Sequence, residues 1–104
     1  MTVQEIASRL SASVIVDAKK EAKAFYVGDF LSRVMGKAPS ECCWLTVMNN
    51  VNVAGVATLA EIAVVVLCEG VEPDERLIQK CEEEEISLLT TSLGAFEASA
   101  VLAK

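Results

Sequence analysis

The chain has 104 residues, of which 53% are hydrophobic, so it can form one core but is short for two. We therefore expect a single domain over residues 1–104. Its net charge of −6 argues against nucleic acid as a partner, because affinity for phosphate backbones comes from clustered Lys and Arg. The chain also lacks histidine, the usual acid/base group at neutral pH and the commonest transition-metal ligand.

No basic segment followed by an apolar stretch begins the chain, and its longest apolar run, Ile62 to Cys68, is far below the roughly 20 residues that span a bilayer. We expect a cytoplasmic protein that does not bind membranes. The cysteines lack C-x-x-C spacing and stand in apolar or helical segments, which predicts that they pack in the core; they are Cys42, Cys43, Cys68 and Cys81.

The first half of the chain predicts a helix, two strands and a second helix. Thr2 and Glu5 have the spacing of a capping box, so a short helix should follow. The runs "ASVIVDA" and "KAFYVG" are typical of strands, and a charged segment joins them. Apolar residues from Phe30 to Met35 then recur at helical spacing, which predicts a helix over 29–37.

From residue 42 onward, strand and helix patterns alternate. The predicted strands are "CCWLTVM", "IAVVVLC" and "ISLLTT"; helices are expected at "NVAGVATLAE", from Pro73 onward, and after Ser92, which is expected to cap the last one. The run "IAVVVLC" is apolar on both faces, as a strand covered on both sides must be. This alternation implies parallel pairing, hence an α/β fold: a three-layer α/β/α sandwich with a mostly parallel sheet of about four to five strands.

In such sheets, ligands bind outside the carboxyl ends of the strands. We therefore expect one rim of ligand-binding residues, which are Gly28, Asp29, Asn49, Asn50, Asn52, Glu69, Gly70, Thr90, Thr91 and Ser92. Amides and hydroxyls dominate this set, and such groups recognise a ligand more readily than they catalyse a reaction.

Three asparagines within four residues allow two interpretations. Asn tolerates left-handed turns and caps helices, so turn chemistry alone explains much of the segment. One of the three is expected to be the cap of the following helix. Three exceed what a cap needs, so a contact with a small molecule or anion remains the alternative.

Other features also have two interpretations. Asp29 and Glu69 fit helix capping and rim polarity, or else an acid/base or metal pair. Trp44 and Met48 share one face of a strand and fit the core better than a platform for stacking a base. The run Glu82 to Glu85 fits a solvated helix end, with contact to a partner or cation as the alternative.

The order of the motifs from "YVGDFLSRVM" to "LLTTSLGAFEASAVL", roughly residues 24 to 103, resembles the DRTGG domain family. The resemblance implies a regulatory module without catalysis, often at a dimer interface, with a fold similar to the N-terminal domain of the kinase/phosphorylase that acts on the histidine-containing phosphocarrier protein. The family's Gly-Asp-Arg-type turn falls here on Met48, Asn49 and Asn50, so a contact made by that Asp and Arg is missing.

These observations favour a non-catalytic regulatory or sensing domain that binds a metabolite or nucleotide at the rim, as a homodimer and without a cofactor. The alternative is a protein-interaction adaptor without a small-molecule ligand, which would use the acidic helix end and the sheet edge. The sequence has no Ser or Cys that could pair with His and no phosphate-binding glycine loop, so phosphotransfer or hydrolase activity is the least favoured hypothesis.

Overall fold

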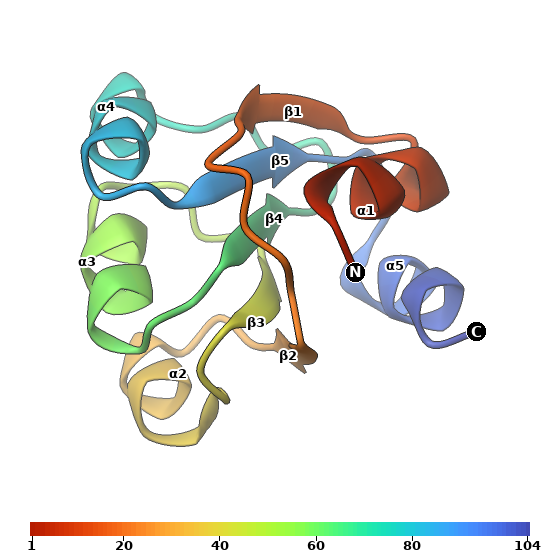
Figure 1. Cartoon of the computed structure of the whole chain (residues 1–104), viewed down its shortest axis with the longest axis horizontal. Coiled ribbons are helices and arrows are strands. Elements are labelled where there is room, and N and C mark those ends of the chain that lie inside the picture. The colour runs from red at the N-terminus through yellow and green to blue at the C-terminus, as the bar shows by residue number, and fades with distance from the viewer.

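The computed structural model describes residues 1–104 and contains one five-stranded sheet with helices on both faces (Figure 1). The sheet order is β1-β5-β4-β3-β2. The strands are β1 (Ser13–Val16), β2 (Ala24–Val27), β3 (Cys42–Thr46), β4 (Val64–Leu67) and β5 (Ser87–Thr90). The helices are α1 (Val3–Leu10), α2 (Leu31–Lys37), α3 (Asn52–Leu59), α4 (Glu75–Glu83) and α5 (Ala95–Leu102). The predicted α/β fold with a mostly parallel sheet is confirmed.

β4 lies at the centre of the sheet, as its apolar sequence predicts. All four of its residues are buried, and it pairs in parallel with β3 on one side and β5 on the other. β2 continues the parallel set beyond β3, with Phe25 paired to Cys43. The carboxyl ends of β2, β3, β4 and β5 therefore lie at one end of the sheet.

β1 departs from the parallel pattern. It pairs antiparallel with β5, with Ser13 opposite Thr90, and a bulge interrupts the register between Val14 and Val16. The two strands that are consecutive at the start of the chain thus form opposite edges of the sheet, and residues 17–23 connect them (Figure 1).

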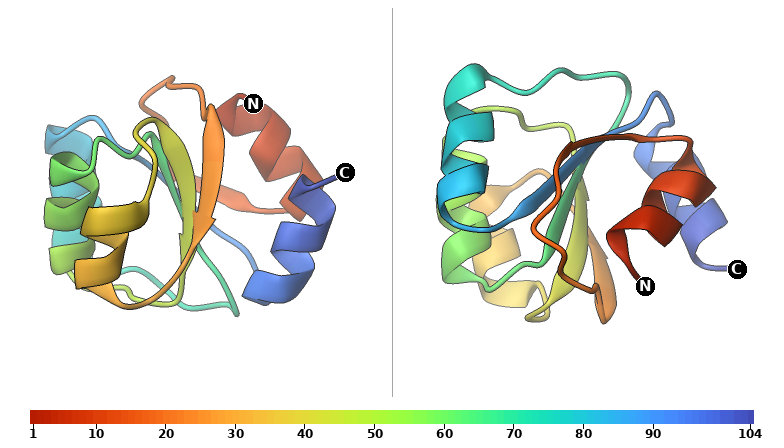
Figure 2. Two further views of the ribbon diagram at one scale, coloured as in Figure 1. Left: turned by 90° about the horizontal axis from the view of Figure 1, so that it is seen from below. Right: turned by 45° about the horizontal axis from the view of Figure 1, so that its top comes forward.

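Helices cover the two faces unequally (Figure 2). α2, α3 and α4 cover one face, where Trp44, Val65 and Leu88 belong to the first core cluster. α1 and α5 cover the other face, where Leu45 and Leu89 belong to the second. Successive strand residues contribute to opposite clusters, as the pleat requires. None of the helices has the length and apolar character needed to cross a bilayer.

The helix ends confirm one predicted cap and correct the predicted start of α4 and the predicted cap of the last helix. Thr2 and Glu5 form the predicted capping box, in which the Thr2 hydroxyl accepts from the Glu5 N–H and the Glu5 carboxylate accepts from the Thr2 N–H. α4 begins after Asp74, whose carboxylate accepts the Arg76 N–H, and not at Pro73.

The last helix is capped at Gly94 and not at Ser92. The Glu97 carboxylate accepts a 2.9 Å hydrogen bond from the Gly94 N–H. Two further residues lie between Ser92 and the helix because Thr91 holds this turn: its hydroxyl accepts from the Leu93 N–H.

Candidate functional site

The ends of β2 and β3 are joined through Asp29. Its Oδ1 accepts hydrogen bonds from the Thr46 hydroxyl (2.7 Å) and from the Val47 N–H (2.9 Å). Gly28 lies beside this link, where its carbonyl accepts the Trp44 indole N–H at 2.8 Å. A Cβ at Gly28 would lie 3.1 Å from the Tyr26 ring, so the glycine allows the ring to pack closely. The polar groups of Asp29 and Gly28 are therefore largely engaged within the fold.

The asparagines divide between structural and free side chains. The Asn49 side-chain amide donates to the Glu72 carbonyl at 2.8 Å, and the Asn49 backbone carbonyl accepts the Asp74 N–H. Asn49 therefore ties the loop after β3 to the loop before α4. The Asn50 side chain accepts the Asn52 N–H, which closes the turn before α3. The cap position is Val51 and no side chain caps α3, so the expectation of an asparagine cap is wrong; Asn50 precedes the cap and acts in the turn. Asn52 is exposed, and its side chain makes no hydrogen bond within the chain.

The loop after β4 and the end of β5 form a second part of the rim. The Gly70 N–H donates to the Thr91 carbonyl (2.9 Å), and Glu69 and Gly70 both have positive φ angles, +62° and +71°. The buried Thr91 hydroxyl donates to the Leu10 carbonyl at 2.9 Å, so it anchors α1 to this turn. Thr90 is half-buried and Ser92 is exposed beside it.

A groove of about 480 Å³ opens at this second part of the rim. Its volume lies within the range of small-molecule sites, roughly 300 to 1,000 Å³. The groove is lined by Ser11, Ser13, Ile15, Gly70, Val71, Glu72, Pro73, Ile78, Thr90, Thr91 and Ser92. Four of the residues expected at the rim line it: Gly70, Thr90, Thr91 and Ser92.

The remaining expected residues lie outside the groove. Asp29, with Gly28, joins the ends of β2 and β3. Asn49 and Asn50 lie on the loop between β3 and α3, and Asn52 is the first residue of α3. Glu69 is exposed beside Gly70 but does not line the groove. The rim is therefore divided into two parts and does not form one continuous site.

Sequence reasoning missed the contribution of Ser11 and Ser13 to the groove. They reach it because β1 runs antiparallel to β5, which places the start of β1 beside the end of β5. Ser11 follows α1 in a left-handed conformation (φ 50°) that turns the chain into β1. The available signal was a pair of serines at the start of a strand of uncertain position, which does not identify a site without the strand order.

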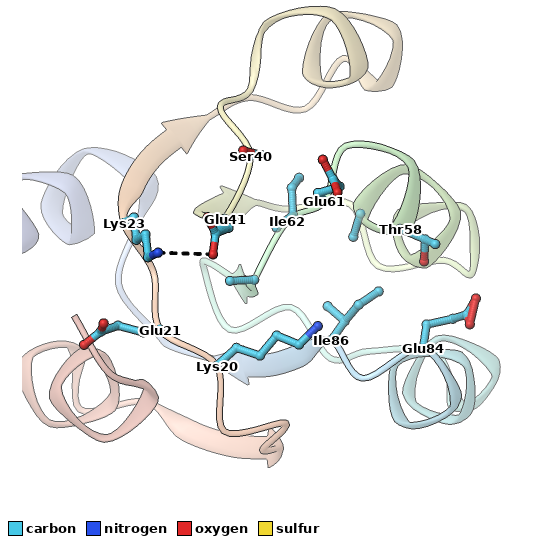
Figure 3. A pocket seen from close by; sticks show the side chains of 12 residues that line it. Lys20, Glu21, Lys23, Ser40, Glu41, Thr58, Glu61, Ile62, Glu84 and Ile86 are labelled. Atoms are coloured by element: carbon cyan, nitrogen blue, oxygen red, sulfur yellow. Dashed lines mark ion pairs between the residues drawn. The ribbon is translucent and has the colours of Figure 1, made fainter.

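A larger cavity of about 640 Å³ lies at the opposite end of the sheet (Figure 3). It is lined by Lys20, Glu21, Lys23, Ser40, Glu41, Ala57, Thr58, Glu61, Ile62, Ala63, Glu84 and Ile86. Lys23 forms an ion pair with Glu41 at 3.5 Å, and Lys20 extends across the cavity toward Ile86. All its polar lining residues are exposed, and the C-terminal ends of α3 and α4 border it. Its side chains form a solvated surface of mixed charge, which gives it little means to orient a ligand.

The cysteines pack in the core, as predicted: all four are buried with free thiols. Burial raises the pKa of the Cys42, Cys68 and Cys81 thiols to about 11, and that of Cys43 further. At Cys68 the negative charges of Asp29 and Glu69 add to this effect on the pKa. The thiols are therefore protonated at neutral pH, in the form that is a poor nucleophile. Trp44 is likewise fully buried, which confirms its assignment to the core.

Fold and groove together define an α/β domain with a hydroxyl-rich groove at the carboxyl end of an open sheet. The model of the DRTGG domain matches residues 5–104, and the chain belongs to the DRTGG domain family. The match confirms the resemblance seen in the sequence and extends it to the N-terminal helix. No curated protein matches the chain.

Five chains among solved structures match. One is the crystal structure of the CBS and DRTGG domains of the regulatory region of Clostridium perfringens pyrophosphatase, complexed with its activator, diadenosine tetraphosphate. The TM-score is 0.78 at 13% sequence identity, and the alignment covers 97% of this chain and 45% of that one. The likeness establishes a shared fold, and the chain spans less than half the length of that regulatory region.

Proposed function

We propose that the chain is a non-catalytic regulatory domain that binds a small metabolite or nucleotide at the carboxyl-end rim and acts as a homodimer. The groove of about 480 Å³ carries this proposal, because it combines hydroxyl groups from two segments, residues 11–13 and 90–92, with the exposed backbone of Gly70. Support also comes from the family and from the regulatory region of similar fold, which was crystallised with a nucleotide activator.

The chemistry of the groove favours an uncharged polar group such as a nucleoside. Hydroxyls at Ser13, Thr90 and Ser92 can each donate and accept hydrogen bonds. No Lys or Arg lines the groove, and Glu72 contributes a negative charge. Phosphate binding normally uses cationic side chains or free helix N-termini. A nucleotide would therefore place its sugar or base here and direct its phosphates toward solvent.

The test is a thermal-shift screen of nucleosides, nucleotides and dinucleotides. A ligand at 100 times its dissociation constant stabilises the native state by about 2.7 kcal/mol. For a chain near 100 residues, this corresponds to an increase in Tm of about 10 °C or more.

Two matched variants locate the ligand. Ser92→Tyr fills the groove, whereas Ser40→Tyr places the same bulk in the cavity at the opposite end of the sheet. Both serines are exposed, so both variants should fold. Loss of the thermal shift in Ser92→Tyr alone supports the proposed site. Loss in Ser40→Tyr alone assigns the ligand to the opposite cavity and overturns the rim proposal.

The second candidate function is a protein-interaction adaptor, which the acidic end of α4 favours. Glu82 to Glu85 are all exposed, and the one ion pair among them joins Lys80 to Glu83 at 3.6 Å. Such exposed charges would attract a basic partner over a Debye length of about 8 Å at physiological ionic strength. Binding that weakens steeply with added salt, in the absence of any small-molecule hit, would favour the adaptor.

A further inference from the structure

We propose that Asn49 is a positioning residue for the groove: it holds the loop of residues 69–74, which forms one wall of the groove, in place. This role rests on the proposed function, which takes the groove as the ligand site. Asn49 does not line the groove itself and acts through the loop. The two parts of the rim, separate in position, are thereby connected.

Loop 69–74 supplies one wall of the groove. Gly70, Val71, Glu72 and Pro73 line the groove from this loop, and Ile78 of α4 lies next to them in the lining. The rest of the lining comes from the turn into β1, from β1 itself and from the end of β5. The shape of the groove therefore depends on where this loop lies relative to β1 and β5.

The first half of the loop is fastened to the turn after β5. The Glu69 N–H donates to the Leu93 carbonyl at 2.8 Å, and the Gly70 N–H donates to the Thr91 carbonyl at 2.9 Å. The next N–H, that of Val71, closes a tight turn at the end of β4 and reaches no other segment. These bonds fix the loop as far as Val71.

The second half of the loop depends on Asn49. Between Val71 and the start of α4, only two hydrogen bonds reach another loop or strand, and Asn49 makes both. Its side-chain amide donates to the Glu72 carbonyl at 2.8 Å, and its backbone carbonyl accepts the Asp74 N–H at 3.1 Å. Pro73, between these two points, has no N–H to donate. We call this pair of bonds the Asn49 link; it joins the loop after β3 to the loop before α4, which run side by side (Figure 2).

The Asn49 link sets the position of the wall but can open. Asn49 is exposed, so water competes for the hydrogen bond of its side chain. Such a bond contributes modestly to stability, because folding exchanges it for bonds to water. Local opening of a loop also costs far less free energy than global unfolding. The wall is therefore the part of the groove that a single residue controls.

Opening and closing of the Asn49 link connects the groove with the segment before α3. A ligand that contacts the wall and orders it also orders Asn49. By reciprocity, any contact that orders Asn49 raises the affinity of the groove for that ligand. Asn50 closes the same turn by accepting the Asn52 N–H, and Asn52 is exposed at the start of α3. The domain thus has a connection from the groove to an exposed polar surface.

Hydrogen exchange tests the Asn49 link without a ligand. The exchange rate of the Asp74 amide is measured by NMR in the unmodified chain, in Asn49→Ala and in the control Gln4→Ala. Gln4 also donates an exposed side-chain amide hydrogen bond, to the Asp17 carboxylate at 2.7 Å, but it does not touch the loop. We expect exchange about fivefold faster in Asn49→Ala, the factor that corresponds to one ordinary hydrogen bond, and an unchanged rate in Gln4→Ala.

A second variant keeps the shape of the side chain. Asn49→Asp has no donor for the Glu72 carbonyl and should accelerate Asp74 exchange as Asn49→Ala does. An unchanged rate in the folded Asn49 variants, or equal acceleration in Gln4→Ala, overturns the positioning role.

Ligand affinity tests the consequence for the groove, with adenosine as the probe and calorimetry as the measurement. We expect adenosine to bind about fivefold more weakly to Asn49→Ala than to the unmodified chain, and equally well to Gln4→Ala. Adenosine should also slow Asp74 exchange in the unmodified chain. Faster exchange in Asn49→Ala with unchanged affinity for adenosine overturns the role of Asn49 in the groove. An unmodified chain that does not bind adenosine overturns the nucleoside ligand of the proposed function, and the exchange rates alone then decide whether Asn49 holds the wall.

Discussion

The Asp29 carboxylate accepts a 2.7 Å hydrogen bond from the Thr46 hydroxyl, and this contact fastens the loop after β2 to the last residue of β3. Thr46 is 1% exposed and its hydroxyl also accepts the Met48 N–H at 3.2 Å. A single buried hydroxyl therefore organises the turn from which the asparagine segment begins. The Asp29 carboxylate also accepts the Val47 N–H, so it binds the backbone of the first residue after β3 as well.

Thr46→Val should destabilise the chain by about 2 kcal/mol, since a hydrogen bond to a charged group contributes roughly 1.5 to 3 kcal/mol. Valine keeps the shape of threonine but cannot donate to Asp29 or accept from Met48. Urea unfolding followed by circular dichroism measures the change. Thr46→Ser is the control, because it retains the hydroxyl and loses one methyl group, worth about 0.8 kcal/mol of burial. Equal losses in the two variants would contradict a role for the hydrogen bond.

Asn49 and Asn52 should separate stability from recognition. Asn49→Ala removes the bond to the Glu72 carbonyl and should lower the free energy of unfolding by about 1 kcal/mol. Asn52→Ala removes no hydrogen bond within the chain and should leave stability unchanged. A fall in ligand affinity in folded Asn52→Ala would show that the asparagine segment contacts the ligand. Unchanged ligand affinity in a folded variant that carries both Asn49→Ala and Asn52→Ala would restrict the ligand site to the groove beside β5.

Stability should decline at alkaline pH because of the buried thiols. A thiol whose pKa is raised to about 11 in the folded chain, as at Cys81, holds its proton more tightly there than in the unfolded chain, where the pKa is near 8.5. Its stabilising effect is complete below about pH 8.5 and is lost as the pH rises toward 11. Urea unfolding between pH 7 and pH 10 should show the decline. Cys81→Ala, compared at each pH with the unmodified chain, should show a smaller decline; an identical slope would assign the effect to other groups.

Much of the fold was accessible from the sequence because local pattern and tertiary position agreed. The uninterrupted apolar run at β4 could only be stable with helices on both faces, and the structure buries it completely. The position of β1 was not accessible. Its sequence, SVIV, would suit either edge of the sheet, and the choice of β5 as antiparallel partner depends on packing of the connection and of α1.

The rim illustrates the same limit. The general rule predicts a ligand site at the carboxyl ends of the strands, and the groove lined by Thr90 and Ser92 opens at that end of the sheet. It could not show that Asp29 and Asn49 are engaged by hydrogen bonds to neighbouring loops, because those partners come from segments 17 and 23 residues away. Nor could it supply Ser13, which reaches the groove only through the antiparallel pairing of β1.

Glu85 offers a stabilising substitution at the end of α4. The residue has a positive φ of 56°, and the Ile86 N–H donates to the Cys81 carbonyl while the Glu85 N–H donates to the Glu82 carbonyl. This is the Schellman pattern, in which glycine is the preferred residue at the left-handed position. A side chain there costs about 1 to 2 kcal/mol, and glycine recovers this at an entropic cost of about 0.5 to 1 kcal/mol. Glu85 also adds a negative charge at the negative end of the helix dipole.

Glu85→Gly should therefore raise the free energy of unfolding by about 1 kcal/mol. Glu85→Gln is the matched control, since it removes the charge and keeps the strained backbone, and it should give only a few tenths of a kcal/mol. Urea unfolding at low and high salt separates the two contributions: salt should diminish the gain from glutamine and leave most of the gain from glycine. The prediction fails if Glu85→Gly is less stable than Glu85→Gln at both salt concentrations. That result would show that the left-handed backbone at Glu85 costs less free energy than the added flexibility of glycine.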